Sequence, residues 1–370
     1  MKTALVHEWL TPYATGGAEL VVKEILNIIS ADLYALIDFE STNPNSYLYK
    51  RKIGTTFLQH LPSSARHIQQ YLPFFPLAIE QLDLTGYDVI ISSSHAVAKG
   101  VITTPYQVHI CYCHSPMRYA WDLTFDYLRD SGKGFKSFVA RYILHQLRQW
   151  DVISSHRVDY FIANSHHIAK RIGRCYGREA TVIYPPVAVD DFPLQVEKED
   201  FYITVCRLVS YKKVSLLVEA FNELGKPLLI IGDGGEYNSL KSMAKSNITF
   251  LGRVDFATMK YYLAKARCFV YGALEDFGIA IVEAQACGTP VIAYAVGGAG
   301  ETVLDIREYP KNGTGVLFKE QNKESLMEAV KIFEEKKSLF NPYQCRLNAE
   351  KYSVKVFQEQ FSQFYQSVLR

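Results

Sequence analysis

The chain has 370 residues, which is enough for two domains of ordinary size, each with its own core. Hydrophobic residues make up 48% and charged residues 21%, so the composition excludes an intrinsically disordered protein, and the net charge of +2 gives no whole-chain argument for binding nucleic acid. No apolar stretch is long and uninterrupted enough for a transmembrane helix, and the first residues read as a strand rather than as a signal peptide.

Short apolar runs alternate with amphipathic helical stretches along the chain, which is typical of parallel α/β domains. In the first half, the pattern predicts a helix over 18–29 and strands over 3–7, 88–92, 108–113, 160–164 and 181–184. In the second half, it predicts helices over 214–224, 279–287 and 323–336, and strands over 202–206, 228–232, 248–251, 268–271, 291–294 and 316–318.

A domain boundary is predicted at Tyr184-Pro185-Pro186, because two prolines stiffen the chain and a polar, acidic stretch follows them. We therefore expect an N-terminal domain over 1–185, a linker over 186–200 and a C-terminal domain over 201–351. Residues 352–370 carry apolar side chains at helical spacing and are expected to form a closing helix. The fold class expected is α/β, with two Rossmann-like, doubly wound domains facing across a cleft at the carboxyl ends of their strands.

The loop after the first strand ends in the motif Gly16-Gly17-Ala18-Glu19 and leads into a helix. Paired glycines at a helix N-terminus let backbone amides approach a phosphate, and the helix dipole favours the anion. A plain strand–loop–helix turn explains the same residues equally well. The loop is too long, and lacks the third glycine, for a dinucleotide-binding fingerprint.

Two cations, Arg207 and Lys212, follow the strand predicted over 202–206. Cations at the mouth of a cleft can neutralise a diphosphate, above all one that gains charge as it leaves. Taken alone, solvated surface charge is the simpler explanation. The next predicted strand is followed by Gly232-Asp233-Gly234, which a tight turn would also explain.

Two acids follow the strand predicted over 268–271. Glu275 lies in the loop Glu275-Asp276-Phe277-Gly278-Ile279, and Glu283 lies in the helix that begins near Gly278. Carboxylates accept hydrogen bonds from sugar hydroxyls, and a ribose diol suits one of them. The amides of Gly278 and Ile279 are expected to be available to a phosphate at the helix start.

These residues resemble the retaining GT-B glycosyltransferases of family GT4. The resemblance rests on the Glu275–Glu283 spacing with Phe277-Gly278 inside it, on 286–293 and Gly297-Gly298-Ala299-Gly300-Glu301, and on the Arg207, Lys212, Gly232 and Gly16 motifs in family order. The stretch 113–119, with Trp121-Asp122 after it, resembles a mannosyltransferase-like bacterial subgroup of that family. The resemblance runs along nearly the whole chain.

The resemblance implies a role for each residue. Arg207 and Lys212 would hold the donor diphosphate, Glu283 the ribose, and Glu275 the transferred sugar with help from the amides of Phe277 and Gly278. His114 would face that sugar from the other domain, and the backbone around Arg253 and Val254 would line the base pocket. On its own, His114 would more often be a structural histidine.

The activity implied is hexosyl transfer with retention of configuration, in bacterial surface polysaccharide synthesis. We expect a nucleotide sugar as co-substrate, GDP-mannose or a UDP-hexose, and a saccharide or polyprenyl-linked saccharide as acceptor. We expect no metal and no other cofactor, because the sequence lacks the Asp-x-Asp motif of metal-using transferases. A nucleotide-sugar epimerase and a non-catalytic sugar-binding protein remain as alternatives.

The seven cysteines are scattered and lack zinc-ligand spacing, so we expect free thiols and a cytoplasmic location. Two stretches mix cations with aromatic residues and suggest peripheral contact with an anionic membrane at the inner face of the plasma membrane. One is 50–76; the other, 129–178, holds ten lysines and arginines against three acids. An ordinary solvated helix face is the alternative for both.

Overall fold

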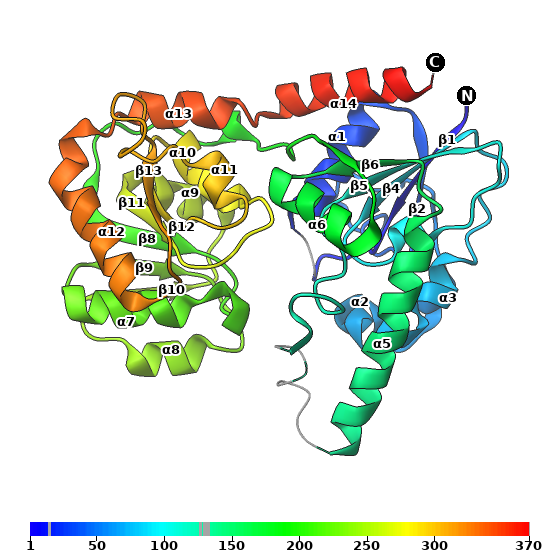
Figure 1. Ribbon diagram of the computed structural model, residues 1–370, viewed down its shortest axis with the longest axis horizontal. Coiled ribbons are helices and arrows are strands. Elements are labelled where there is room, and N and C mark those ends of the chain that lie inside the picture. Colours follow the sequence, from blue (N-terminus) through cyan, green and yellow to red (C-terminus); the bar gives the residue numbers. More distant parts are fainter. Residues whose placement is uncertain (14–15, 126–127, 129–133, 370) are drawn as a thin grey trace. The chain divides into compact units, whose positions relative to one another are not determined.

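The computed structural model describes residues 1–13, 16–125, 128 and 134–369, and the chain divides into two compact units (Figure 1). Unit 1 comprises Met1–Pro185 together with Phe357–Arg370, and unit 2 comprises Pro186–Val356. Among the described helices, none combines the length and apolarity needed to cross a membrane.

Unit 1 is built on a seven-stranded sheet whose strands all run parallel, in the order β3-β2-β1-β4-β5-β6-β7. The strands are β1 (Thr3–His7), β2 (Ala31–Ala35), β3 (Ile53–Gly54), β4 (Val89–Ser94), β5 (Val108–Cys113), β6 (Tyr160–Ala163) and β7 (Ala180–Val182). Because the order reverses beside β1, the loops after β1, β4 and β5 leave from neighbouring positions on the carboxyl edge.

Helices cover both faces of this sheet. On one face, α1 (Gly17–Ile28) packs with α14 (Val354–Val368), whose Phe357 and Phe361 are fully buried in that core. On the other face lie α3 (Phe75–Ile79), α5 (Phe135–Ser155) and α6 (His166–Tyr176). Shorter helices are η1 (Phe57–His60), α2 (Ser64–His67), η2 (Ile68–Phe74) and η3 (Ala98–Gly100). The last helix of the chain therefore completes the core of unit 1 rather than that of unit 2.

Unit 2 contains a six-stranded parallel sheet in the order β10-β9-β8-β11-β12-β13. Its strands are β8 (Glu199–Val205), β9 (Leu228–Ile231), β10 (Ile248–Gly252), β11 (Ala266–Tyr271), β12 (Val291–Tyr294) and β13 (Gly315–Phe318). Both faces of these strands are covered, so the strands read as short apolar runs instead of an alternating pattern.

The helices of unit 2 alternate with its strands. Helices α7 (Val214–Leu224) and α12 (Lys323–Lys336) pack on one core, and α10 (Ile279–Ala286) contacts α13 (Pro342–Glu350). The others are η4 (Val189–Asp191), η5 (Ser210–Lys212), α8 (Tyr237–Met243), α9 (Phe256–Lys265), α11 (Ala299–Thr302) and η6 (Lys337–Leu339). The expected α/β class, with two doubly wound, Rossmann-like domains, is confirmed.

Some sequence expectations need correction. Strands β2 and β3 were not predicted, because β2 carries Asp32 within a short alternating run and β3 has only two residues. Residues 186–200, expected as a linker, belong to unit 2, where they form η4 and the start of β8.

The described cysteines are free thiols, as expected: five are buried, and Cys175 and Cys206 are half-buried.

A buried ion pair joins α5 to the sheet of unit 1. Lys99 of η3 contacts Asp151 of α5, and both side chains are almost completely buried. The second oxygen of Asp151 accepts hydrogen bonds from Trp121 Nε1 at 2.8 Å and from the Tyr176 hydroxyl at 2.9 Å. Because each polar atom of the carboxylate has a partner, the charge is tolerated in the core.

Replacing Lys99 by methionine is expected to destabilise unit 1 by about 3–5 kcal/mol, because Asp151 would keep a buried charge without its cation. Chemical denaturation followed by circular dichroism measures the change. The matched control is Lys2→Met, which removes a cation whose Nζ lies 3.7 Å from Asp32 on the surface and should cost less than about 1 kcal/mol. Equal unfolding midpoints for the two variants would show that the buried pair contributes no stability.

Candidate functional site

The predicted site residues of unit 2 follow neighbouring strands at the carboxyl edge of its sheet. Arg207 and Lys212 follow β8, and Glu275 follows β11, which pairs with β8. The structure brings Lys212 and Glu275 together: Lys212 Nζ forms an ion pair with Glu275 Oε1. The Tyr271 hydroxyl, at the end of β11, donates a hydrogen bond to the same oxygen. Tyr271 was not singled out from the sequence, since it reads there only as a strand residue.

The electrostatic surroundings of Lys212 favour its charged form. Burial by itself would lower the pKa of Lys212, but the adjacent Glu275 carboxylate outweighs it, and the pKa is raised. The ammonium lies near two aromatic rings, 5.5 Å from the centroid of Tyr211 and 5.8 Å from that of Tyr271. Both members of the pair remain partly accessible, with 18% of the Lys212 side chain and 15% of the Glu275 side chain exposed. A charged ligand can therefore reach the ammonium.

The loop that carries Glu275 is held by two glycines. The Gly298 amide donates a hydrogen bond of 2.8 Å to the Glu275 carbonyl, and Gly297 bridges to Glu275 as a parallel strand would. Gly297 has a φ of +86°, and a Cβ atom there would lie 2.2 Å from the Glu275 oxygen. A Cβ at Gly298 would lie 2.2 Å from the carbonyl oxygen of Phe277. Only glycine permits the two backbone segments to lie this close together. In the sequence, the family motif was the only indication of this contact.

The end of the same loop becomes the start of α10. Phe277 is buried, with its ring 5.5 Å from that of Tyr352, and Gly278 caps the helix with a φ of +89°. The helix begins at Ile279, so its first N–H groups have no partner within the helix and its positive dipole end lies beside Glu275. This arrangement suits an anion.

Glu283 stands within α10 and is half-buried. Desolvation by burial raises the pKa of its carboxyl group to about 7. Among the described residues, none forms a hydrogen bond or ion pair with this side chain. Because this carboxyl group is poorly hydrated and lacks a protein partner in the described part of the chain, it is suited to bind a ligand hydroxyl.

The remaining predicted residues of unit 2 line the same edge. A Cβ at Gly232 would lie 1.8 Å from the Cys206 carbonyl oxygen, and one at Gly234 2.3 Å from that of Leu208. The loop after β9 therefore packs directly against the backbone around Arg207, which is exposed. Exposed Arg253 and half-buried Val254 follow β10, where the Gly232 amide donates to the Gly252 carbonyl at 2.9 Å.

The predicted residues of unit 1 are joined by a chain of polar contacts. The Gly16 amide donates to Glu19 Oε2 at 2.7 Å, and Glu19 Oε1 lies 4.0 Å from His7 Nε2. His7 Nδ1 lies 3.1 Å from Ser93 Oγ, which is 2.8 Å from His114 Nε2. The Gly16 amide therefore already has a partner in the absence of ligand. Gly16 and His114 lie at opposite ends of this chain, which links β1, β4 and β5, and Gly17 is the first residue of α1.

The histidines in this chain lie in a dry environment. Burial lowers the pKa of His114 well below its usual value, and nearby His95 and His7 lower it further, so His114 is neutral at physiological pH. The buried Glu8 carboxylate accepts hydrogen bonds from the His95, Ala96, Val97 and Ala98 amides and so fixes the loop after β4. His7, Ser93 and Glu8 carried no signal in the sequence, because their contacts join strands far apart along the chain.

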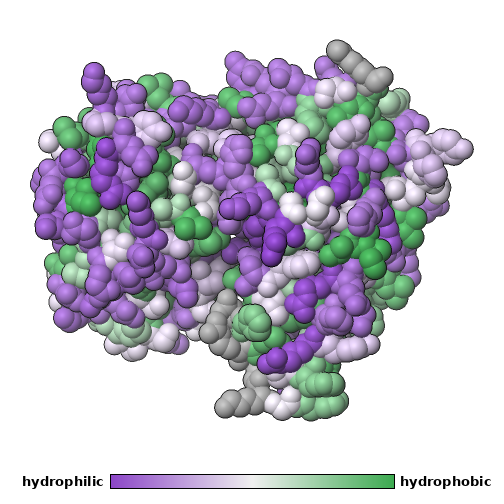
Figure 2. Space-filling view, in the orientation of Figure 1, coloured by the Kyte–Doolittle hydropathy of each residue, from purple (hydrophilic) through white to green (hydrophobic). Residues whose placement is uncertain are grey.

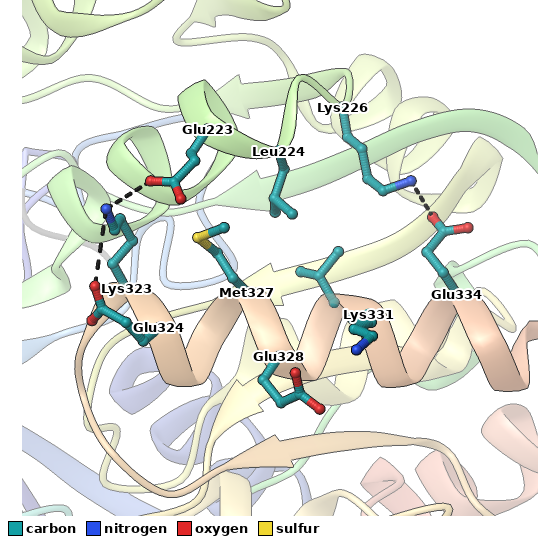
Figure 3. A pocket seen from close by; sticks show the side chains of 10 residues that line it. Glu223, Leu224, Lys226, Lys323, Glu324, Met327, Glu328, Lys331 and Glu334 are labelled. Carbon is teal, nitrogen blue, oxygen red and sulfur yellow. Dashed lines mark hydrogen bonds and ion pairs between the residues drawn. The ribbon is translucent and has the colours of Figure 1, made fainter.

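Other parts of the molecule are less suited to a ligand of this kind. A groove of about 510 Å³ lies between the end of α7 and α12, with ion pairs Lys323–Glu223 and Lys226–Glu334 across it (Figure 3). None of the predicted site residues lines this groove. Within the described ranges, no group of three or more His, Cys, Asp or Glu side chains is placed to hold a metal ion.

The glycine contacts give a testable prediction. Gly298→Ala should displace the Glu275 loop, since the new Cβ would overlap the backbone of Phe277, and should weaken nucleoside diphosphate binding at least about tenfold. Gly235→Ala is the matched control, because a Cβ there meets nothing within 4 Å. Isothermal titration calorimetry with GDP and UDP measures both variants. Unchanged binding of GDP and UDP by Gly298→Ala would show that the position of the Glu275 loop does not affect nucleotide binding.

A second prediction follows from the pKa of Glu283. Since this pKa is about 7 in the folded chain against an ordinary value of 4.5, the unfolded chain releases the proton first, and folded-state stability falls as the pH rises from about 4.5 to 7. Glu283→Gln cannot titrate at this position and so does not lose this stability. Its melting temperature relative to that of the wild type should therefore be higher at pH 8 than at pH 5. Glu320→Gln, which changes an exposed glutamate, is the control. A difference in melting temperature between Glu283→Gln and the wild type that stays the same from pH 5 to pH 8 would contradict the raised pKa of Glu283.

Comparisons with known proteins match both halves of the chain to glycosyltransferase families. The family description "Glycosyl transferases group 1" matches residues 189–352, and "Glycosyltransferase Family 4" matches residues 15–191. An uncharacterized glycosyltransferase of Methanocaldococcus jannaschii is 25% identical over 337 residues, covering 89% of this chain and 88% of that protein. A GDP-mannose-dependent monoacylated alpha-(1-6)-phosphatidylinositol monomannoside mannosyltransferase of Corynebacterium glutamicum is 39% identical over 113 residues, covering 26% of this chain and 30% of that enzyme.

Solved structures share the fold. Sucrose-phosphate synthase from Thermosynechococcus elongatus aligns with a TM-score of 0.73 at 18% identity, covering 100% of this chain and 99% of that chain. Anabaena HepE in complex with UDP aligns with a TM-score of 0.68 at 17% identity, covering 99% of this chain and 100% of that chain. The two sequence relatives named above are a glycosyltransferase and a mannosyltransferase, which favours transfer over the epimerase and non-catalytic alternatives. The chain is a glycosyltransferase of GT-B fold and belongs to the group 1 glycosyltransferases, with a family 4 domain in its N-terminal half.

Proposed function

We propose that the protein transfers a hexose from a nucleotide sugar to a saccharide or polyprenyl-linked saccharide, with retention of configuration at the sugar. The observation that carries the proposal is the accessible Lys212–Glu275 pair beside the start of α10. A cation, a carboxylate and free helix amides at one edge match a ligand that combines a diphosphate with a sugar.

The proposal assigns the donor to the carboxyl edge of unit 2. Arg207 and Lys212 bind the diphosphate, Glu275 accepts hydrogen bonds from the transferred sugar, and Glu283 accepts them from the ribose. The amides of Phe277, Gly278 and Ile279 assist at the phosphate and sugar. Gly232 and Gly234 let the donor approach the backbone, and the segment at Arg253 and Val254 lines the base pocket.

Unit 1 supplies the acceptor side in this proposal. His114 contacts the transferred sugar through the ring edge that does not face Ser93, and the Gly16-Gly17 start of α1 approaches a phosphate oxygen. Because the Gly16 amide donates to Glu19 without ligand, donor binding would have to replace that contact.

The reaction breaks the bond between the anomeric carbon and the diphosphate oxygen and forms a bond from that carbon to the acceptor oxygen. The acceptor proton passes to the departing phosphate, so no protein base is required. Arg207, Lys212 and the α10 amides stabilise the negative charge that gathers on the leaving diphosphate. In this mechanism the cations and amides replace a metal ion.

Loss of one cation should slow transfer strongly. Arg207→Met or Lys212→Met is expected to lower the transfer rate roughly a hundredfold, because each cation stabilises charge that develops in the transition state. Lys226→Met is the matched control: Lys226 Nζ also pairs with a glutamate, at 3.2 Å from Glu334, but it precedes β9 at the other edge of the sheet. A transfer rate within a few-fold of the wild-type rate in both site variants would contradict the assignment of Arg207 and Lys212 to the leaving diphosphate.

The donor is proposed to be GDP-mannose, with a UDP-hexose as the alternative. The mannosyltransferase-like stretch 113–119 and the mannosyltransferases among the relatives support mannose. HepE bound to UDP shows only that this fold accommodates uridine in another protein. A site that hydrogen-bonds the C2 hydroxyl can separate mannose from glucose, because the wrong epimer leaves buried polar groups unpaired.

Calorimetric titration of GDP and UDP into one preparation tests the donor. We expect GDP to bind at least about tenfold more tightly than UDP. UDP binding without detectable GDP binding would overturn the proposed donor and leave the enzyme class intact. A cytoplasmic location, where nucleotide sugars and reduced thiols are both available, is part of the proposal.

A further inference from the structure

Helix α5 exposes apolar side chains along its first half. Phe135 is 80% exposed, Phe138 67%, Tyr142 60% and Val139 37%. Their spacing of three, four and seven residues puts them on one face of a helix that turns 100° per residue. We call this set the α5 stripe. Soluble proteins rarely leave three large aromatic side chains together in water, so the α5 stripe marks a contact surface.

The opposite face of α5 anchors the helix. Leu144, Leu147 and Asp151 are buried against unit 1, and Asp151 is the partner of Lys99 in the buried ion pair. The first half of α5 extends past the strands of unit 1, and apolar side chains gather at the corresponding end of the surface view (Figures 1 and 2). The α5 stripe is therefore presented outward from a helix whose second half is anchored in the core of unit 1.

Charge on α5 identifies the partner. Lys136 and Arg141 are exposed, and at 100° per residue they fall on either side of the α5 stripe. Between residues 135 and 150 the helix has no acidic residue. An apolar face with one exposed cation on each flank, Lys136 and Arg141, matches a lipid interface, where the rings enter the acyl boundary and the cations reach lipid phosphates.

The remaining cations and aromatic residues of the two stretches suggested by the sequence contribute less. In 50–76, Phe75 is buried, Phe57 and Tyr71 pack against the core, and only Phe74 of the four aromatic residues is half exposed. In 129–178, Arg157 pairs with Glu80, Arg171 pairs with Asp122, and Arg148 and Arg178 donate to backbone carbonyls. Residues 129, 130 and 133 lie outside the described part of the chain.

We propose that the α5 stripe docks the enzyme on a membrane containing anionic lipids. A second copy of the chain fits this face poorly, since pairing two such helices would oppose cations with cations and offer no acid to either. The biological purpose, access to a lipid-linked acceptor, rests on the proposed function, but the docking itself does not. Docking can be measured without donor, acceptor or turnover.

Vesicle co-sedimentation tests the docking. The full chain should bind vesicles with about one third anionic phosphatidylglycerol, bind neutral phosphatidylcholine vesicles at least about tenfold less, and be released by high salt. Phe135→Ser/Phe138→Ser should reduce binding to anionic vesicles at least about tenfold, and Lys136→Glu/Arg141→Glu should do the same. The matched control is Tyr343→Ser/Leu347→Ser, which changes two exposed apolar residues one turn apart on α13.

Each outcome decides for or against the proposal. Loss of vesicle binding in both α5 variants, with nucleoside diphosphate binding and melting temperature unchanged, supports it. No binding by the wild type, or equal binding by the α5 and α13 variants, overturns it. A concentration-dependent dimer in light scattering that Phe135→Ser/Phe138→Ser abolishes, without vesicle binding, would assign the α5 stripe to a second copy instead. If docking holds but no nucleotide binds, the proposed function fails independently.

Discussion

The hydrogen bond from the Gly298 amide to the Glu275 carbonyl fixes the loop on which the proposed donor site depends. Because neither Gly297 nor Gly298 has a side chain, the loop after β11 approaches the backbone after β12 closely enough to run beside it. In that position the Glu275 carboxylate contacts the Lys212 ammonium and the Tyr271 hydroxyl. Helix α10 begins a few residues later, at Ile279. One backbone contact thereby sets a cation, a carboxylate and a helix N-terminus at one edge of the sheet.

Much of this arrangement could be predicted from the sequence. Strands β1, β5 and β12 and helices α7 and α12 have the predicted bounds, since short uninterrupted apolar runs define the strands and clear helical periodicity defines the helices. The edge on which the site residues lie also follows from the sequence, because loops after parallel strands leave from the same side. What could not be predicted is which side chains meet. The Lys212–Glu275 contact depends on β8 pairing with β11, and the chain from Glu19 to His114 depends on three strands being adjacent.

Burial acts differently on the ionisable groups of the two units. In unit 1, every carboxylate oxygen of Asp151 and Glu8 has a partner: a cation, an indole N–H and a hydroxyl for Asp151, and backbone amides for Glu8. In unit 2, Glu283 has no such partner among the described residues, and its pKa rises to about 7. The satisfied carboxylates stabilise the fold, including the anchored end of α5, whereas a carboxylate left without a partner is suited to bind a ligand.

Hydrogen–deuterium exchange with and without saturating GDP or UDP tests most directly whether the donor binds at the carboxyl edge of unit 2. We predict slower exchange of backbone amides over 207–213 and 275–282, with little change in α7, α12 and the groove between them. Protection confined to that groove, or no protection in either loop under conditions where calorimetry shows the nucleotide to be bound, would contradict it.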